Sequence, residues 1–274
     1  MLNDDRIVLQ NNTHKKGPSG ARNTGLDIAS GKYIAYQDSD DEWFEHHLEK
    51  MVHYLDKPEG KIDLMSADPL RKYEETGEVF NYDKMTMETI PHKCEGELFL
   101  INPDCLFEKQ LMGRVITTQC MVGKSAVLKA VRWNESLKAA VDILYNLEVC
   151  SQNITVGHLS DYHAIYWAHN DNLTNVGGDH SPKRMERVQR SFIRYWELVL
   201  ETFTLTQSQQ HYVETNLAKS LAWHLACHSL EPQGKFKEAT TYYLKAIKVR
   251  PSNFKYYKAF SKALFKSMFS SNAQ

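Results

Sequence analysis

GPSGARNTGLDIASGKYIAYQDSDDEW, residues 17–43, is the most informative segment of the chain. Within it, a strand-like run at residues 31–37 is followed by three carboxylates, Asp38, Asp40 and Asp41. Residues at the carboxyl end of a strand in an α/β sheet face the crevice in which ligands bind. Carboxylates this close together repel one another, and Mg²⁺ or Mn²⁺ would relieve that repulsion and could also bridge a diphosphate. The alternative is a solvated acidic turn that caps the next helix.

Residues 17–43 resemble the centre of the family 2 glycosyltransferases, the inverting enzymes with the GT-A fold. Three patterns in fixed order carry the resemblance: Gly-Pro-x-x-Ala-Arg-Asn-x-Gly at 17–25, Ala-x-Gly-x-Tyr-Ile at 29–34, and the Asp-x-Asp (DXD) motif at 38–40. The resemblance implies an α/β fold with a Rossmann-like GT-A domain. It also implies a nucleotide-diphosphate sugar donor, a UDP-sugar, and Mn²⁺ or Mg²⁺ as the cofactor.

The resemblance assigns roles to single residues as well. Arg22 is implied to face the nucleotide, and Asp38 to face its ribose or the metal. Asp40 and Asp41 are implied metal ligands. His169 follows a predicted strand and is a candidate for contact with the diphosphate or metal, with a surface histidine as the alternative.

A second acidic motif begins at Trp133. Trp133 and Glu135 match the family pattern, and Asp142 aligns with its aspartate, but Val141 stands where glutamate is usual. An inverting transfer needs one carboxylate to take the proton of the acceptor hydroxyl, and we assign this role to Asp142. The alternative is a carboxylate that stabilises a helix N-terminus. Glu135 and Glu148 are the substitutes for Asp142.

Length, charge and cysteine usage exclude several classes of protein. The chain has 274 residues, which suits one catalytic domain with an appendage or two small domains. A net charge of −1 gives no electrostatic case for nucleic acid. The five cysteines are scattered without CxxC spacing, which argues against a disulfide framework or a zinc site and predicts a cytosolic protein. The sequence contains no run of 18 apolar residues, so it predicts no membrane span.

Sequence patterns, together with the order of elements that the family resemblance implies, predict the secondary structure of the first 180 residues. We expect strands and helices with the following bounds: strands 4–9, 33–36, 62–67, 116–123 and 162–168, and helices 20–30, 42–55 and 125–130. Residues 68–104 are expected to be irregular, with a hairpin turn at 73–77.

The domain prediction is a truncated GT-A domain at residues 1–180 and an α-helical region at residues 181–274. By comparison with the family, we expect the first βαβ unit to be missing from this sequence, so that another chain supplies it, the recorded start is internal, or the fragment is only marginally stable. The first strand of that unit is central in a doubly wound sheet. Without it, the neighbouring strands would expose unpaired backbone groups. Within the helical region, residues 220–251 resemble one tetratricopeptide-like hairpin, whose small residues allow close packing.

The leading interpretation is a metal-dependent inverting glycosyltransferase of the hexosyltransferase type, acting in polysaccharide or glycoconjugate synthesis on a saccharide, lipid-linked or other hydroxyl acceptor. We expect a cytoplasmic protein, or one peripheral at the cytoplasmic membrane face through its basic tail. The alternative is a catalytically impaired remnant that binds a protein partner through the helical tail. Glycoside hydrolysis by two carboxylates is a third interpretation, which gives no role to Ala-Arg-Asn.

Overall fold

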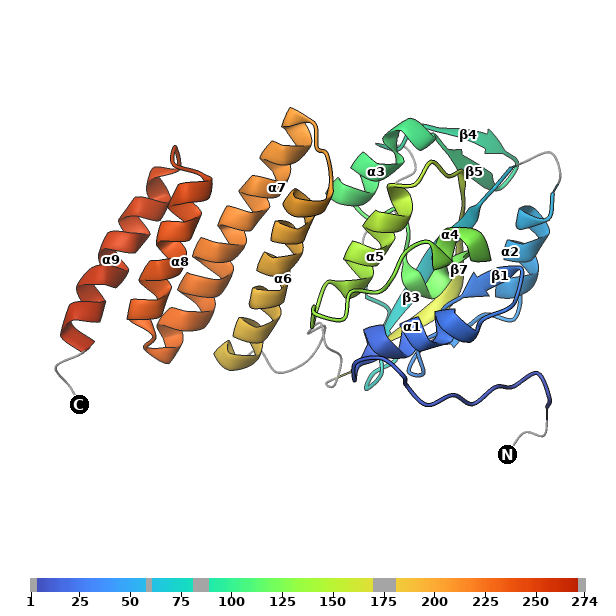
Figure 1. The fold of residues 1–274 in the computed structure, drawn as a ribbon, viewed down its shortest axis with the longest axis horizontal. Coiled ribbons are helices and arrows are strands. Elements are labelled where there is room, and N and C mark those ends of the chain that lie inside the picture. Colours follow the sequence, from blue (N-terminus) through green and yellow to red (C-terminus); the bar gives the residue numbers. More distant parts are fainter. Residues whose placement is uncertain (1–3, 58–60, 81–88, 170–180, 271–274) are drawn as a thin grey trace. The chain divides into compact units, whose positions relative to one another are not determined.

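The computed structural model describes residues 4–57, 61–80, 89–169 and 181–270. The chain divides into two compact units (Figure 1). The sheet unit comprises residues 1–136 and 141–167, and the helical unit comprises residues 137–140 and 168–274. The α/β fold and the helical C-terminal region that the sequence predicts are therefore both present.

The sheet unit is built on seven strands in the order β1-β6-β3-β7-β5-β4, with β2 paired to β7 beside this path. The strands have these bounds: β1 Tyr33–Ala35, β2 Glu42–Trp43, β3 Leu64–Tyr73, β4 His92–Glu95, β5 Leu98–Ile101, β6 Val122–Lys124 and β7 Val156–Ala168. Ile34 lies opposite Gly123 in the antiparallel pair β1–β6. Among the described residues, β1 therefore forms one edge of the sheet.

Helices flank this sheet and close its core. They have these bounds: α1 Pro18–Ile28, α2 His47–Leu55, α3 Pro103–Met112, α4 Ser125–Lys129, α5 Val141–Cys150 and the 3₁₀ turn η2 Thr118–Cys120. Met51 and Leu55 of α2 belong to one buried cluster with Met65 of β3 and Leu159 of β7. Burying this apolar surface is the main force that holds α2 on the sheet.

A glycine lets the preceding segment lie close to α1. The helix begins at Pro18, whose fixed φ suits the first helical turn. A Cβ atom on Gly20 would lie only 1.9 Å from the backbone oxygen of Lys15. A residue other than glycine would therefore push the chain before α1 out of place.

Two predicted elements near the acidic motif are wrong. Residues 4–9 form no strand, and Leu9 is 97% exposed. The helix predicted at 42–55 begins only at His47. Glu42 and Trp43 instead form the short strand β2 directly after the acidic motif, because β7 provides a partner strand for their backbone.

The region between the two acidic motifs is more regular than the sequence suggests. Residues 68–104, predicted to be irregular, contain the end of β3, the hairpin β4–β5 and the start of α3. The strand predicted at 116–123 is the turn η2 followed by β6. The hairpin turn at 73–77 is confirmed, since Gly77 donates to the Tyr73 carbonyl at 2.8 Å and has a φ of 68°.

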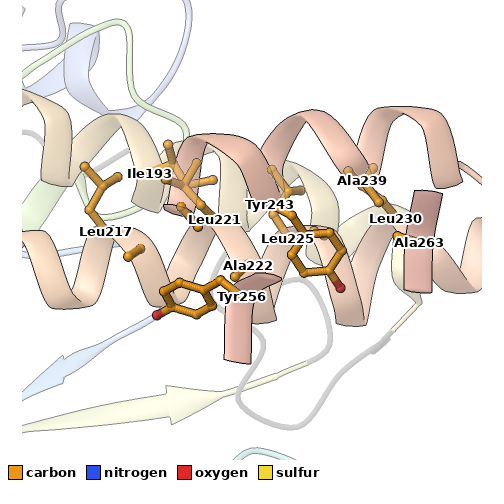
Figure 2. Close-up of a cluster of buried hydrophobic side chains, with 13 residues drawn as sticks. Ile193, Leu217, Leu221, Ala222, Leu225, Leu230, Ala239, Tyr243, Tyr256 and Ala263 are labelled. Carbon is orange, nitrogen blue, oxygen red and sulfur yellow. The ribbon is translucent and has the colours of Figure 1, made fainter. Parts of the chain in front are cut away.

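The helical unit consists of antiparallel neighbours with a shared core (Figure 1). Its elements are α6 Pro182–Thr202, α7 Gln207–Lys219, the π-helical segment η3 Ser220–Leu230, the 3₁₀ turn η4 Glu231–Gln233, α8 Phe236–Val249 and α9 Phe254–Ser270. Figure 2 shows Leu225 and Tyr243 packed among small residues, Ala222 and Ala239, that let η3 and α8 approach closely. The assignment of this pair as a tetratricopeptide-like hairpin stays a prediction.

One half-buried carboxylate ties α6 to the start of α8. Glu186 accepts hydrogen bonds from Arg190 at 2.8 Å, Gln233 at 2.9 Å and Lys235 at 2.7 Å. Burial acts to raise the pKa of Glu186, but these hydrogen bonds outweigh it and lower the pKa to about 2.

The depressed pKa of Glu186 predicts acid sensitivity of the helical unit. The stabilisation is present above the pKa of about 4.3 that an unfolded glutamate has, and it is lost as pH falls toward about 2. We expect Glu186→Gln to be less stable than the wild type at pH 7 and to lose less stability between these two pH values. Urea unfolding followed by hydrogen exchange of residues 182–249 measures this. The exposed Glu201→Gln on the same helix is the control, and an equal pH dependence of both variants would contradict the assignment.

Candidate active site

Arg22 and Asp38, both predicted to face the donor, are in direct contact. Arg22 of α1 donates from Nη2 to Oδ1 of Asp38 at 2.5 Å. The guanidinium carbon also lies 4.5 Å from the ring centroid of Trp133, a cation–π distance. The two charged side chains are only 18% and 34% exposed. Helix α1 and the segment after β1 thus bring one cation and one anion of the motif together, with the cation on the ring of Trp133.

Trp133 is the middle layer of an aromatic stack beneath Arg22. Its buried ring lies face to face with Tyr145 of α5, with centroids 4.0 Å apart and planes 5° apart. Tyr36 meets the same tryptophan edge-on at 5.2 Å. The Tyr145 hydroxyl donates to the Leu128 carbonyl at 2.8 Å, and so it accepts from the Tyr36 hydroxyl, also at 2.8 Å. Stacked aromatic pairs add about 0.5–1.5 kcal/mol beyond their burial.

The stack connects both acidic motifs. Tyr36 lies two residues before Asp38, and Tyr145 lies three residues after Asp142. Residues three apart share a face of a helix. The contact between the two tyrosines therefore brings the first half of α5, where Asp142 is exposed in the first turn, to the end of β1.

Asn23 and Glu135 hold the loop that carries Trp133. The Asn23 amide donates to the Trp133 carbonyl at 3.0 Å and accepts from the Trp133 amide at 2.9 Å. Asn23 also donates to Glu135 at 2.8 Å, and the Lys15 amide donates to the same carboxylate at 3.1 Å. These hydrogen bonds lower the pKa of Glu135. Because its oxygens already accept these hydrogen bonds, Glu135 is better suited to hold the segment before α1 in place than to accept a proton from a substrate.

The carboxylates of the DSDD segment have three different environments. Asp38 pairs with Arg22, Asp40 is exposed, and Asp41 is 8% exposed. One oxygen of Asp41 accepts from the Trp167 amide at 3.2 Å. Burial raises the pKa of Asp41 to about 7, and the charges of Asp40 and Asp38 act in the same direction. A cation at this place would relieve both causes.

The arrangement fits a metal that is shared with a substrate. Within the described part of the chain, the DSDD carboxylates do not form a group of three converging ligand atoms. Mg²⁺ is commonly held by one or two carboxylates together with substrate phosphates, not by an all-protein cage. Asp40 and Asp41 therefore fit a Mg²⁺ or Mn²⁺ ion whose coordination a diphosphate completes.

His169 and Glu148 are the remaining predicted residues near the site motifs. His169 follows β7 and belongs to the helical unit, so its role at the donor stays a prediction. Glu148 of α5 is half-buried, and burial raises its pKa to about 7. Sequence analysis gave no role to Tyr36 and Tyr145. The available signal was that each tyrosine lies within three residues of a predicted site aspartate.

Comparisons with known proteins identify a family and several relatives. Residues 1–124 match the model of Glycosyl transferase family 2. Residues 1–124 are therefore identified as a Glycosyl transferase family 2 segment. It is similar to an Escherichia coli UDP-Glc:alpha-D-GlcNAc-diphosphoundecaprenol beta-1,3-glucosyltransferase, with 42% identity over 55 residues, covering 20% of this chain and 22% of the relative. It is also 30% identical over 137 residues to the succinoglycan biosynthesis protein ExoW of Rhizobium meliloti, covering 47% and 41%.

The chain therefore spans less than half the length of these curated relatives. A solved mannosyltransferase from Pyrobaculum calidifontis, in complex with GDP-Man and Mn²⁺, is similar over 95% of this chain and 68% of its own. The sequence identity is 11% and the TM-score is 0.41, so this likeness supports no residue assignment. In the parts of the chain that the structure describes, no helix has the length and apolar character needed to cross a bilayer.

Proposed function

We propose that this family 2 chain is a metal-dependent inverting glycosyltransferase that moves a sugar from a UDP-sugar to a hydroxyl acceptor. The observation that carries the proposal is the Arg22–Asp38 pair on Trp133, next to the exposed Asp40. Relatives named for polysaccharide synthesis and for a diphosphoundecaprenol-linked acceptor support a saccharide or lipid-linked acceptor. Work on such an acceptor would take place at the cytoplasmic membrane face.

Arg22 and Asp38 bind the nucleotide in this proposal. The contact with Asp38 engages Nη2, and a guanidinium carries five N–H donors in a fixed plane, which suits phosphate oxygens. The ring of Trp133 packs against one face of the guanidinium and fixes its position, so the Arg22 side chain needs to move little when a donor binds. Asp38 in turn is a hydrogen-bond acceptor for a ribose hydroxyl.

Asp40 and Asp41 would hold Mn²⁺ or Mg²⁺ in this site. A bound divalent ion supplies charge stabilisation for the diphosphate leaving group. Asp142 removes the proton of the acceptor hydroxyl, since a positioned carboxylate is the group that an inverting transfer requires. In this proposal the first acidic motif binds the donor through the metal ion, and the second activates the acceptor.

Calorimetric titration of the folded chain with UDP tests the donor site. We expect binding that depends on Mn²⁺ and that disappears in Asp40→Ala, because the shared metal ion loses its exposed ligand. Asp104→Ala removes an exposed aspartate elsewhere in the sheet unit and should bind UDP like the wild type. A folded wild-type chain that binds no UDP in the presence of Mn²⁺ would contradict the proposal and favour the partner-binding alternative.

A further inference from the structure

A cluster of imidazoles and one carboxylate lies outside the donor site. His46, Asp161 and His163 each offer a ligand atom, and these atoms all lie within 4.8 Å of one another. His46 precedes the first residue of α2, and the other two lie on β7. The cluster therefore joins two elements that are more than 100 residues apart in the sequence.

The distances between the ligand atoms are close to those of a metal site. The Nε2 atom of His163 lies 3.0 Å from Oδ1 of Asp161, and Nε2 of His46 lies 4.0 Å from Oδ2 of the same carboxylate. Ligand atoms of a tetrahedral zinc ion are roughly 3.3 Å apart, given Zn–N bonds of about 2.0–2.1 Å. His46 and Asp161 have side chains that are 42% exposed and can close this gap, while His163 is fully buried.

One nitrogen of the cluster has no hydrogen-bond partner among the described residues. The Nε2 atom of His46 is buried from solvent and has no hydrogen-bond partner among the described residues. Leaving a buried polar atom unpaired costs free energy, and such an atom calls for an explanation. Its ring packs edge-on against the ring of His163, with centroids 4.8 Å apart, so the two imidazoles are held together at the cluster.

A further histidine, His47, contacts the second ring nitrogen of His163. Nδ1 of His163 faces Nδ1 of the buried His47 at 3.1 Å. When Nε2 of His163 is a metal ligand, the Nδ1–H group of His163 donates a hydrogen bond to Nδ1 of His47. Metal-bound histidines almost always have such a partner on the second nitrogen, which fixes the tautomer and the orientation of the ring.

The Lys50 ammonium would compete with a metal ion for the carboxylate of Asp161. It lies one turn after His46 on α2 and donates to Oδ2 of Asp161 at 2.8 Å. The same ammonium lies 3.4 Å from a carboxylate oxygen of Glu97, so it has an alternative partner when a metal ion takes Asp161.

We propose that His46, Asp161 and His163 bind a zinc-type divalent metal ion that fastens the start of α2 to β7. Two imidazoles and one carboxylate form a three-ligand set of the kind that zinc accepts, with water in the fourth position. The site is separate from Asp40 and Asp41, which offer only oxygen ligands and suit a harder ion. The cysteine-based argument against zinc does not apply to it, because none of its ligands is a cysteine.

Isothermal titration of the nucleotide-free full chain with Zn²⁺ tests this site, and Co²⁺ absorption reports the ligand geometry. We expect one equivalent of Zn²⁺ to bind and to raise the melting temperature of the wild type. His46→Ala should weaken binding more than about 100-fold, because even loss of an outer-shell partner costs 10–100-fold in affinity. His53→Ala, an exposed histidine on the same helix, should bind Zn²⁺ normally.

Two more variants separate this site from its alternatives. Lys50→Met removes the competing ammonium and should tighten Zn²⁺ binding, a gain that misfolding cannot produce. Asp40→Ala should keep the high-affinity Zn²⁺ site. The proposal is overturned by a folded wild type that binds no Zn²⁺. Equal affinity in His46→Ala and the wild type, or loss of binding in Asp40→Ala alone, would also overturn it.

Discussion

Asp142→Asn is expected to lower kcat by about 10²–10⁴-fold, the usual contribution of a positioned general base. Asparagine has nearly the same size as aspartate but cannot accept the proton of the acceptor hydroxyl. Asp142 is exposed in the first turn of α5, so the substitution should disturb little packing. Because the donor side of the site is unchanged, Mn²⁺-dependent UDP binding should stay as in the wild type. Steady-state kinetics beside UDP titration measures both quantities.

Two further carboxylates serve as controls for Asp142. Glu135→Gln should reduce stability, because Glu135 receives hydrogen bonds from Asn23 and Lys15, but it should leave kcat within a few-fold of the wild type. Glu148→Gln tests the half-buried carboxyl whose pKa burial raises to about 7. If Glu148→Gln loses activity while Asp142→Asn keeps it, the base is Glu148 and the assignment from the second acidic motif is wrong.

Trp133→Ala is expected to destabilise the sheet unit by about 3–5 kcal/mol, as for other buried tryptophans replaced by alanine. The substitution removes a ring that is 1% exposed and leaves a cavity between Arg22 and Tyr145. It also removes the support of the guanidinium, so UDP affinity should fall even under conditions where the chain is folded. Urea unfolding with hydrogen exchange of residues 141–167 separates this loss from the behaviour of the helical unit.

Trp133→Phe is the matched control for the stack. Phenylalanine keeps an aromatic face for Arg22 and for Tyr145, so most of the UDP affinity should remain although some volume is lost. The role of the stack is contradicted if both variants lower UDP affinity equally, or if Trp133→Ala costs less than about 1 kcal/mol, well below the range for a buried tryptophan.

Residues 17–43 were enough to predict the family, because their motifs pair particular residue types with fixed spacing. The glycine pattern, the Ala-Arg-Asn segment and the DSDD motif each meet a local requirement of chain geometry or charge. The helix around Arg22 was predicted at residues 20–30 and is present at Pro18–Ile28. A requirement met within a few residues can be read in a sequence, since it does not depend on distant partners.

The pairings between distant residues came only from the tertiary structure. Glu42 and Trp43 were predicted to be helical and instead form β2, because β7, more than 100 residues later, offers a partner strand. The stack of Trp133 on Tyr145 and the approach of His46 to His163 likewise join segments that nothing in their own neighbourhood brings together. Local sequence determined the family and the candidate carboxylates of this protein. Long-range packing decided which of them became buried, paired or exposed, since burial and charge pairing depend on the whole fold.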